Sequence, residues 1–372
     1  MHNVLVVGSG ISGCVAARML AENGYSVLMV ERRNHVGGNT YDAKNAAGLT
    51  IQMHGTHIFH AKDARVWDFL TRFTDWRFFQ LKAQTYVEGR HVPFPINQDT
   101  INQLYGFNLD AFSFGRFIDA RRQRLDKPKN LRDAITMRIG EELYDLFFKN
   151  YIRKQWGLDG ETLPVFLAGR QSARENRDER TFTDPFQGVP ERGYSAMFNK
   201  MLAHPGIEVR LNTPYRDLPN DCKRLPTIYT GCIDEYFDYR FGKLPYRSLR
   251  FLFKTYDYEW HQPAAVVHFP NDYDFIRASE CKHWTGESSR QTTVVYEYPT
   301  NDGEPYFPNP TRKARDLYEK YAAAAAEAKG LHFIGPFGRY RNLDMNHAAL
   351  DAMTTVDRHF PPLEPCSVVV VE

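Results

Sequence analysis

A glycine-rich turn near the start of the chain has the residue spacing that binds the phosphates of a dinucleotide. Gly8, Gly10 and Gly13 follow the apolar run VLVV and precede a stretch compatible with a helix. Gly8 permits the tight turn, Gly10 lets the backbone approach a pyrophosphate, and Gly13 lets the helix pack closely on the strand. Glu31 ends the second apolar run, where a carboxylate can accept ribose hydroxyls. The turn predicts a dinucleotide site, with a doubly wound domain that binds nothing as the alternative.

The residues after Glu31 indicate which dinucleotide is bound. The run ERRNHVGGN contains basic residues and then Gly37, Gly38 and Asn39, which is unusual for a nicotinamide-binding fold. It resembles the extended motif of FAD proteins of the glutathione reductase and amine oxidase kind, in which the glycine pair brings backbone close to the flavin diphosphate. FAD is therefore the predicted cofactor. A simple loop that turns at the glycine pair is the alternative.

Three arginines could bind a diphosphate. Arg170 and Arg174 are four residues apart, and Arg277 stands in the strand-like run DFIRASE. A pyrophosphate presents adjacent negative oxygens, and guanidinium groups match such oxygens better than ammonium groups do. An ordinary surface position is the alternative for Arg170.

Aromatic residues on one predicted helix could hold a nucleobase. The stretch IGEELYDLFFKNYIRKQWG predicts one helix that ends at Gly157. Phe147 and Tyr151 are four residues apart and would share a helix face, with Trp156 just beyond them. Two such rings could sandwich a base; an ordinary packed helix is the alternative.

Three histidines at a spacing of three, His54, His57 and His60, could suggest a metal site. The run HGTHIFHA contains a glycine and β-branched residues, however, and has no acidic or cysteine partner close in sequence. No metal site is predicted here.

Composition excludes several classes of protein. The chain has 372 residues, enough for two or three structural units, and its net charge of +2 gives no reason to expect nucleic acid or an anionic membrane as partner. No run of about 18 apolar residues predicts a membrane span. Five scattered cysteines without a CxxC pair indicate reduced thiols and a cytoplasmic location.

The order of the predicted elements indicates an α/β fold in which the nucleotide-binding domain is discontinuous. A βαβ start is followed by a helical stretch near 97–157, by antiparallel strand patterns, and by a final strand and helix that close the nucleotide domain.

Several longer motifs are more specific than a flavin motif. They occur in one order along the chain and comprise GSGISG, ERRNHVGGN, HGTHIFH at 54–60, FFKNYIRKQWG at 147–157, FQGVPERGYSAMF at 186–198, GEPYFP at 303–308 and NLDM at 342–345. Over nearly its whole length the chain resembles the bacterial UDP-galactopyranose mutases. These isomerases interconvert the pyranose and furanose forms of a nucleotide sugar with reduced FAD, and supply galactofuranose for cell-surface polysaccharides.

The resemblance implies three domains and an oligomer. It places a Rossmann-like FAD domain at 1–75, 188–232 and 327–372, a helical domain at 96–165, and a twisted antiparallel sheet domain at 76–95, 166–187 and 233–326. It also implies a homo-oligomer, for which we expect a dimer, and activation by NAD(P)H or another reductant.

The resemblance also assigns roles to residues. Arg174, Arg277, His57 and His60 become catalytic, with the histidine loop crossing the flavin near N5. The cofactor would contact Gly8, Gly10, Ser12, Gly13, Glu31, Arg32, Gly38, Asn39, His57, Val209, Arg339, Asp344 and Met345. The substrate would contact Phe147, Tyr151, Trp156, Arg170, Arg174, Arg277, Tyr306 and Asn342.

The implied reaction changes no oxidation state. Flavin N5 attacks the anomeric carbon and expels the nucleoside diphosphate, and the N5–sugar adduct opens and recloses through O4 instead of O5. The arginines would stabilise the leaving diphosphate and keep it close. No amino-acid nucleophile is required.

Some positions depart from the family pattern. Phe186, Phe307 and Asn342 stand where the family usually has tyrosine, and Thr56 stands where proline is common. Each lost hydroxyl removes a hydrogen bond of about 0.5–1.5 kcal/mol. UDP-galactopyranose is the first choice of substrate; another UDP- or dTDP-sugar, or an amine-oxidase-like oxidoreductase, is the alternative.

Overall fold

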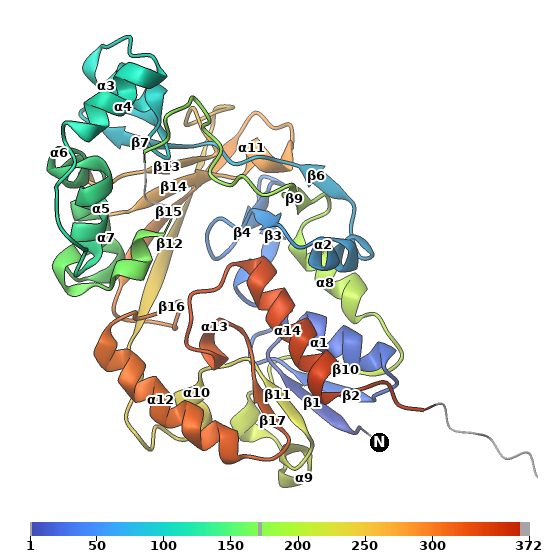
Figure 1. Ribbon diagram of the computed structural model, residues 1–372. Coiled ribbons are helices and arrows are strands. Elements are labelled where there is room, and N and C mark those ends of the chain that lie inside the picture. Colours follow the sequence, from blue (N-terminus) through green and yellow to red (C-terminus); the bar gives the residue numbers. More distant parts are fainter. Residues whose placement is uncertain (1, 170–172, 365–372) are drawn as a thin grey trace, which may run out of the picture.

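The computed structural model describes residues 2–169 and 173–364 (Figure 1). Its nucleotide-binding part is a five-stranded sheet in which every neighbouring pair is parallel. The strand order is β10 (Ile207–Arg210), β2 (Val27–Val30), β1 (Val4–Val7), β11 (Thr227–Tyr229) and β17 (Leu331–Phe333). We call this sheet and its covering helices the parallel-sheet unit.

Helices cover both faces of the parallel sheet because alternate strand residues point to opposite sides. One face packs against α1 (Ile11–Glu22), α8 (Tyr194–Leu202) and α14 (Met345–His359). The other face packs against α10 (Ile233–Tyr236) and α12 (Arg312–Glu327). This arrangement confirms the predicted α/β class with a Rossmann-like core built from segments far apart in the sequence.

A second, seven-stranded sheet lies beside this unit. Its order is β16 (Phe307–Pro308), β12 (Tyr246–Tyr256), β15 (Thr292–Thr300), β14 (Arg277–Glu280), β13 (Val266–His268), β7 (Ala83–Val87) and β8 (Arg90–Phe94). We expected an antiparallel sheet, and the expectation is wrong at one junction, because β13 and β7 pair in parallel. The β7–β8 hairpin comes from an earlier part of the chain and adds to the edge of a later group of strands, so no turn between β7 and β13 fixes their direction.

Helices between β8 and β9 cover part of that sheet. They are α3 (Gln98–Tyr105), α4 (Ala111–Asp119), α5 (Leu131–Ile139), α6 (Glu141–Tyr144), the π-helix Asp145–Lys149 and α7 (Asn150–Trp156). Their apolar side chains form one core with Val87, Val92 and Ile96 of the neighbouring strands and loop. We call α3–α7 the helical cluster. Gly157 ends α7 with a φ of 66°, as predicted.

Short strands connect these parts. β5 (Phe59–Ala61) and β6 (Trp76–Phe78) both pair with β9 (Phe186–Pro190), and β3 (Asp42–Lys44) pairs with β4 (Thr50–Gln52). The remaining helices are α2 (Ala64–Thr71), α9 (Asn220–Lys223), α11 (Lys282–Thr285), α13 (Gly335–Gly338) and the short turns Gly38–Thr40, Gly160–Thr162, Val165–Ala168 and Tyr215–Asp217.

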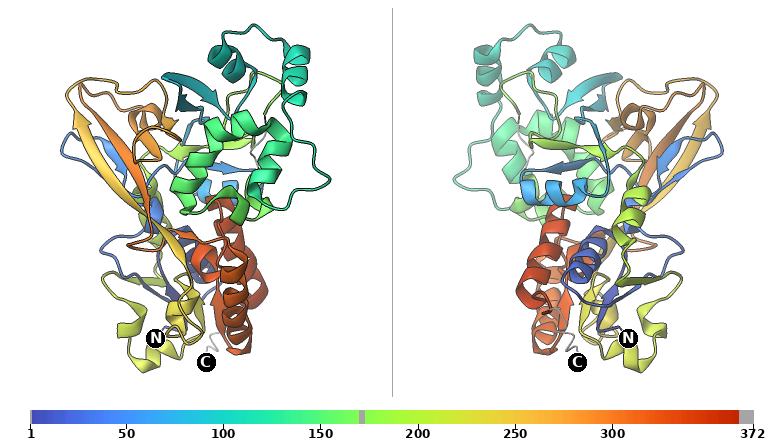
Figure 2. Two further views of the ribbon diagram at one scale, coloured as in Figure 1. Left: turned by 90° about the vertical axis from the view of Figure 1, so that its left-hand side faces the viewer. Right: turned by 90° about the vertical axis from the view of Figure 1, so that its right-hand side faces the viewer.

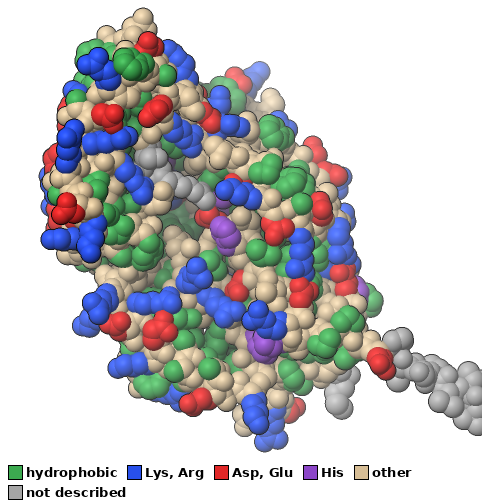
Figure 3. Space-filling view, viewed as in Figure 1, with side chains coloured by type: hydrophobic (Ala, Val, Ile, Leu, Met, Phe, Trp, Pro, Cys, Tyr) green, Lys and Arg blue, Asp and Glu red, His purple; other side chains and the backbone are tan. Residues whose placement is uncertain are grey.

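Two further views place the seven-stranded sheet and the helical cluster side by side on the same end of the parallel-sheet unit (Figure 2). On the face seen in Figure 1, the surface is hollowed between the helical cluster and the parallel-sheet unit, and Lys and Arg side chains gather beside the hollow (Figure 3). Among residues 2–169 and 173–364, no helix is long and apolar enough to cross a membrane.

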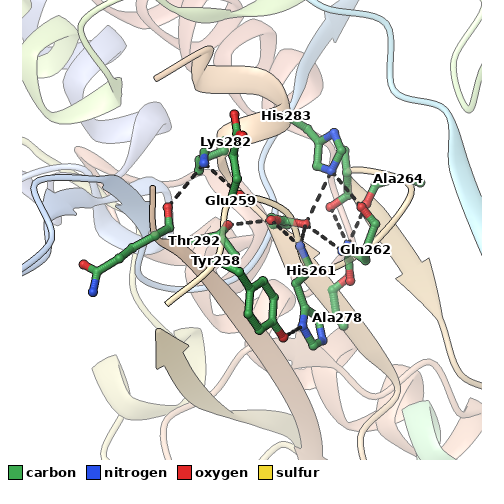
Figure 4. A network of polar contacts seen from close by, with 12 residues as sticks. Tyr258, Glu259, His261, Gln262, Ala264, Ala278, Lys282, His283 and Thr292 are labelled. Atoms are coloured by element: carbon green, nitrogen blue, oxygen red, sulfur yellow. Dashed lines mark hydrogen bonds and ion pairs between the residues drawn. The ribbon is translucent and has the colours of Figure 1, made fainter. Parts of the chain in front are cut away.

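The buried side chains of Glu280 and Lys282 hydrogen-bond to neighbouring chain segments at the end of β14 in the seven-stranded sheet (Figure 4). Glu280 is fully buried and accepts hydrogen bonds from the backbone N–H groups of His261 and Gln262 at 3.0 Å and from the Thr292 hydroxyl at 2.5 Å. Lys282 Nζ donates to the carbonyls of Glu259, Ser289 and Gln291 at 2.7–3.3 Å. These contacts join three separate stretches of chain around β14.

Candidate active site

The glycine turn has the shape that a dinucleotide requires. Gly8 has a φ of +93°, and a Cβ there would lie 2.1 Å from Thr230 Oγ1. A Cβ on Gly13 would lie 1.9 Å from the Gly8 carbonyl oxygen, so the helix packs directly on the turn. A Cβ on Gly10 would meet no atom within 4 Å, which leaves open space in front of the helix N-terminus. The three glycines thus have the separate roles expected for a pyrophosphate-binding turn.

Glu31 lies at the end of β2 and is 6% exposed. Its Oε2 accepts hydrogen bonds from the backbone N–H and hydroxyl of Ser9, both at 2.8 Å, and its Oε1 accepts one from the Arg33 N–H at 2.9 Å. A carboxylate has about four acceptor positions, so Glu31 keeps capacity for a ribose hydroxyl. The Ser12 hydroxyl instead donates to the Ala348 carbonyl at 3.0 Å, which leaves only the Ser12 backbone for a phosphate.

The predicted residue Arg32, together with Arg33 and Glu304, which the sequence did not single out, connects the turn to the other sheet. Arg33 donates to Asn39 Oδ1 at 3.1 Å and to Glu304 Oε2 at 2.6 Å, and Arg32 donates to the same Glu304 oxygen at 3.1 Å. Glu304 follows β15 of the seven-stranded sheet. Gly38 packs against Gly10, because a Cβ on Gly38 would lie 2.9 Å from the Gly10 Cα.

The loop of residues 54–60, which we call the histidine loop, is held at His57 by its backbone. The Gln52 side chain accepts from the His57 N–H at 2.6 Å and donates to its carbonyl at 3.0 Å, and that carbonyl also accepts from Tyr194 Oη at 3.0 Å. His57 Nδ1 lies 3.0 Å from the Gly55 carbonyl. Burial, opposed by that hydrogen bond and assisted by the charge of Arg277, lowers the pKa of His57 to about 4, so the ring is neutral at pH 7.

The other two imidazoles of this loop have different partners. His60 is 5% exposed, stacks on Phe182 and places Nδ1 2.5 Å from Asp184 Oδ2, with Asp344 Oδ2 3.8 Å from Nε2. The His54 carbonyl accepts a hydrogen bond from the Tyr306 hydroxyl. Burial and nearby cationic groups lower the pKa of His54 to about 4.

Arg277 lies on β14 and is held by a buried acid. Its Nε and Nη2 donate to Glu297 Oε2 at 3.0 and 2.6 Å, and Glu297 is fully buried while the Arg277 side chain is 24% exposed. Burial opposes the charge of Arg277, but the carboxylate of Glu297 outweighs it and raises the pKa of Arg277. Nη1 makes no hydrogen bond to any residue in the described part of the chain. Glu297 has no sequence motif of its own that could have revealed it.

Among the residues that the structure describes, Arg174 and Arg277 make no contact with each other. Arg174 Nη1 donates to the carbonyls of Asp178 and Arg180 at 3.0 and 2.5 Å, so its side chain closes its own loop. Burial lowers the pKa of Arg174. Arg170 lies outside the described residues.

The predicted pair Phe147 and Tyr151 has two different sets of neighbours. Phe147 is 2% exposed and belongs to the core of the helical cluster, whereas the Tyr151 ring meets the His268 ring edge-on at 5.5 Å. Phe147 belongs to the π-helix Asp145–Lys149, whereas Tyr151 belongs to α7. Trp156 lies 6.2 Å from the Phe307 ring at the end of α7.

The remaining predicted residues lie in or beside the parallel-sheet unit. Val209 lies on β10 opposite Met29, and Asp344 and Met345 begin α14. Arg339 pairs with Asp351 of α14 at 3.1 Å, and Asn342 is exposed on the preceding loop.

Comparisons with known proteins give a consistent result. A family model described as UDP-galactopyranose mutase matches residues 146–342, and one described as an NAD(P)-binding Rossmann-like domain matches residues 6–73. A probable UDP-galactopyranose mutase of Klebsiella pneumoniae is 32% identical over 362 residues, 95% of this chain and 94% of that protein. A dTDP-fucopyranose mutase of Escherichia coli is 30% identical over 365 residues, 95% and 97% of the two chains.

Two further similarities concern the whole fold and a short stretch of the chain. The crystal structure of a reduced UDP-galactopyranose mutase superposes with a TM-score of 0.77 at 18% identity, covering 96% of this chain and 95% of the other. The flavin-containing amine oxidase B of Sus scrofa is 39% identical over only 56 residues, 15% of this chain and 11% of that protein.

Proposed function

The chain belongs to the UDP-galactopyranose mutase family, whose members are isomerases, and from this premise we propose that it contracts a nucleotide-hexopyranose to its furanose form. UDP-galactopyranose is our first choice of substrate. One observation carries the proposal. Arg277 donates to Glu297, whose Oε1 lies beside Gly55 of the histidine loop, and the strand neighbour of Arg277, His268, meets the ring of Tyr151 at 5.5 Å. These contacts bring a guanidinium, the histidine loop and the aromatic helix together.

We propose FAD as the cofactor. Gly10, Glu31, Gly38 and Asn39 would hold its adenosine and diphosphate, and the open space in front of Gly10 fits that role. When reduced by NAD(P)H or another donor, the flavin supplies a nucleophilic nitrogen for the anomeric carbon. The flavin-containing amine oxidase that matches 15% of this chain supports this choice.

The protein groups then bind and orient the substrate. Arg277 Nη1 would bind the diphosphate and retain it after the glycosidic bond breaks, since the return step is then effectively intramolecular. His57 would place its ring and backbone beside the flavin. Because the ring is neutral at pH 7, it would add no second positive charge to that of Arg277. Tyr151 would stack on the nucleobase. Arg174 and His60 complete the proposed catalytic set.

Several broader expectations belong to the same proposal. The domain division is the one given above, with a FAD domain, a helical domain and a sheet domain. We also propose a homodimer, a cytoplasmic location, and a role in supplying galactofuranose for cell-surface polysaccharides.

The test is anaerobic incubation of FAD-loaded protein with a panel of UDP- and dTDP-hexoses, before and after reduction by dithionite. We expect furanose product only after reduction, separated from the pyranose form by chromatography. Borohydride trapping would then identify by mass any sugar carried on the cofactor. If the reduced protein converts none of these sugars, the proposal fails; amine- or alcohol-dependent flavin bleaching in air would then favour an oxidoreductase.

A further inference from the structure

Four neighbouring strands of the seven-stranded sheet place polar side chains in one row. Thr85 lies opposite His268, His268 lies opposite Arg277, and Arg277 lies opposite Glu297. Directly opposed residues point to the same face of a sheet, and strands are about 4.8 Å apart, so the row spans roughly 14 Å. We call these four residues the polar row.

The two ends of the polar row face different parts of the proposed site. Near one end, the His268 ring meets Tyr151 of α7 edge-on at 5.5 Å. At the other end, a Cβ on Gly55 of the histidine loop would lie 3.1 Å from Glu297 Oε1. Arg277 lies between them. A nucleotide sugar has the same sequence of parts, namely base, ribose, diphosphate and hexose.

Polar atoms in this row lack partners. Within the described part of the chain, Thr85 Oγ1, His268 Nδ1 and Glu297 Oε1 are buried and have no hydrogen-bond partner. Buried polar atoms of native proteins are nearly always paired, so unpaired atoms beside the Arg277 guanidinium indicate a place where a ligand supplies the partner. The His268 side chain itself is partly exposed, which lets its ring reach a ligand.

The chemistry of His268 suits a hydroxyl and not a phosphate. Burial and the neighbouring charge of Arg277 lower the pKa of His268 to about 3, so its ring is neutral at physiological pH. A neutral imidazole has one N–H donor and one acceptor nitrogen. It therefore complements a hydroxyl, which both donates and accepts a hydrogen bond. The position between Tyr151 and Arg277 is the one that ribose occupies when the base lies on Tyr151.

We propose that His268 binds the ribose of the nucleotide sugar and selects ribonucleoside over 2′-deoxyribonucleoside diphosphate sugars. The inference rests on the proposed function, because it uses the base and diphosphate positions assigned there. It also decides between two chemistries represented among the relatives, a UDP-sugar and a dTDP-sugar, in favour of the UDP-sugar.

The test measures binding of UDP and dUDP to the FAD-loaded protein by calorimetry, since these two ligands differ only in the 2′-hydroxyl. We expect UDP to bind at least about tenfold more tightly, because a site built to hydrogen-bond a hydroxyl rejects the analogue that lacks it. His268→Phe keeps a planar ring without nitrogens and should bring the ratio close to one by weakening UDP. His268→Asn keeps a donor and an acceptor and should retain most of the preference.

Thr227→Val is the matched control, because it removes a buried hydroxyl from the parallel-sheet unit and should leave the UDP to dUDP ratio unchanged. Flavin content and thermal unfolding of each variant report its folding. Equal binding of UDP and dUDP by the unaltered protein overturns the inference without use of any variant. An unchanged ratio in folded His268→Phe also overturns it.

The outcome is separable from that of the proposed function. Turnover of UDP- and dUDP-hexoses at equal rates would refute the ribose assignment and leave the mutase activity standing. A strong preference for UDP that depends on His268, without turnover of any sugar, would support the ribose assignment and refute the mutase activity.

Discussion

At the scale of single residues, Arg277 and Glu297 act as a pair in which only the arginine reaches the site. Glu297 is fully buried and takes up Nε and Nη2, so it fixes the guanidinium plane and leaves Nη1 for a ligand. A guanidinium held in this way is prepared for a diphosphate, since little side-chain entropy is lost on binding.

Replacing Arg277 by Ala should therefore have two separable effects. The buried charge of Glu297 would lose its partner, which costs about 3–5 kcal/mol of the free energy of unfolding. Turnover should also fall by at least about 100-fold, since the diphosphate loses its cation. Urea unfolding and furanose production measure the two effects.

The double variant Arg277→Ala with Glu297→Gln separates them. It should recover part of the lost stability, because no buried charge remains, while turnover stays low and flavin remains bound. Recovery of turnover along with stability would contradict a direct role of Arg277 in the site.

At the scale of elements, two glycines of the turn between β1 and α1 differ in the space around them. Gly13 contacts the Gly8 carbonyl, whereas Gly10 has a φ of −68° and faces open space. The substitutions Gly10→Ala and Gly13→Ala add the same methyl group three residues apart, so they form a matched pair.

Gly13→Ala should fail to fold or lose several kcal/mol of stability, because its Cβ would lie 1.9 Å from the Gly8 oxygen. Gly10→Ala should fold with near-normal stability in the absence of cofactor and bind FAD at least about tenfold more weakly. Flavin absorbance after reconstitution and thermal unfolding measure these results. Normal FAD affinity in Gly10→Ala would place the cofactor elsewhere.

The contacts of Glu280 give a second prediction at this scale. Burial opposes ionisation of Glu280, but hydrogen bonds from His283, Thr292 and two backbone N–H groups outweigh it and lower its pKa. Glu280→Ala should leave these donors unpaired and destabilise the seven-stranded sheet by about 3 kcal/mol or more. Hydrogen exchange should show the loss at residues 259–262 and 289–293 before the parallel sheet; uniform loss across both sheets would contradict a local role.

At the scale of the whole molecule, burial keeps histidines of the histidine loop and of β13 uncharged at neutral pH. His54, His57 and His268 have pKa values lowered to about 4, about 4 and about 3, and burial is the largest cause for each. In the unfolded chain these groups titrate near 6.5. The unfolded state therefore binds more protons than the folded state between about pH 4 and 6.5.

Stability should consequently be highest above about pH 6.5 and fall as the pH drops below it. Each such histidine contributes up to about 1.4 kcal/mol per pH unit in that window. The free energy of unfolding by urea at pH 5, 6, 7 and 8 measures the slope. His268→Asn should reduce the slope below pH 6.5, and an identical slope would show that His268 titrates normally.

Much of the molecule could be predicted from local sequence. A few adjacent residues suffice to predict the strand–turn–helix order, the glycine spacing, the position of Glu31 and the helix end at Gly157, because each depends on local backbone geometry. The predicted Rossmann-like core and family membership are confirmed. The site residues assigned from the sequence remain predictions about chemistry, and all of them except Arg170 have described positions.

Only the tertiary structure revealed the partners of those residues. Glu297 behind Arg277, Gln52 and Tyr194 around His57, and the strand neighbours of His268 are joined by sheet pairing and burial, which no local spacing encodes. The same reason explains the parallel β13–β7 junction. The sequence by itself determined where the glycine turn lies, where its strand and helix begin, and where α7 ends. Tertiary packing decided the surroundings of the site side chains, since Phe147 is buried in the core of the helical cluster while the Tyr151 ring lies against His268.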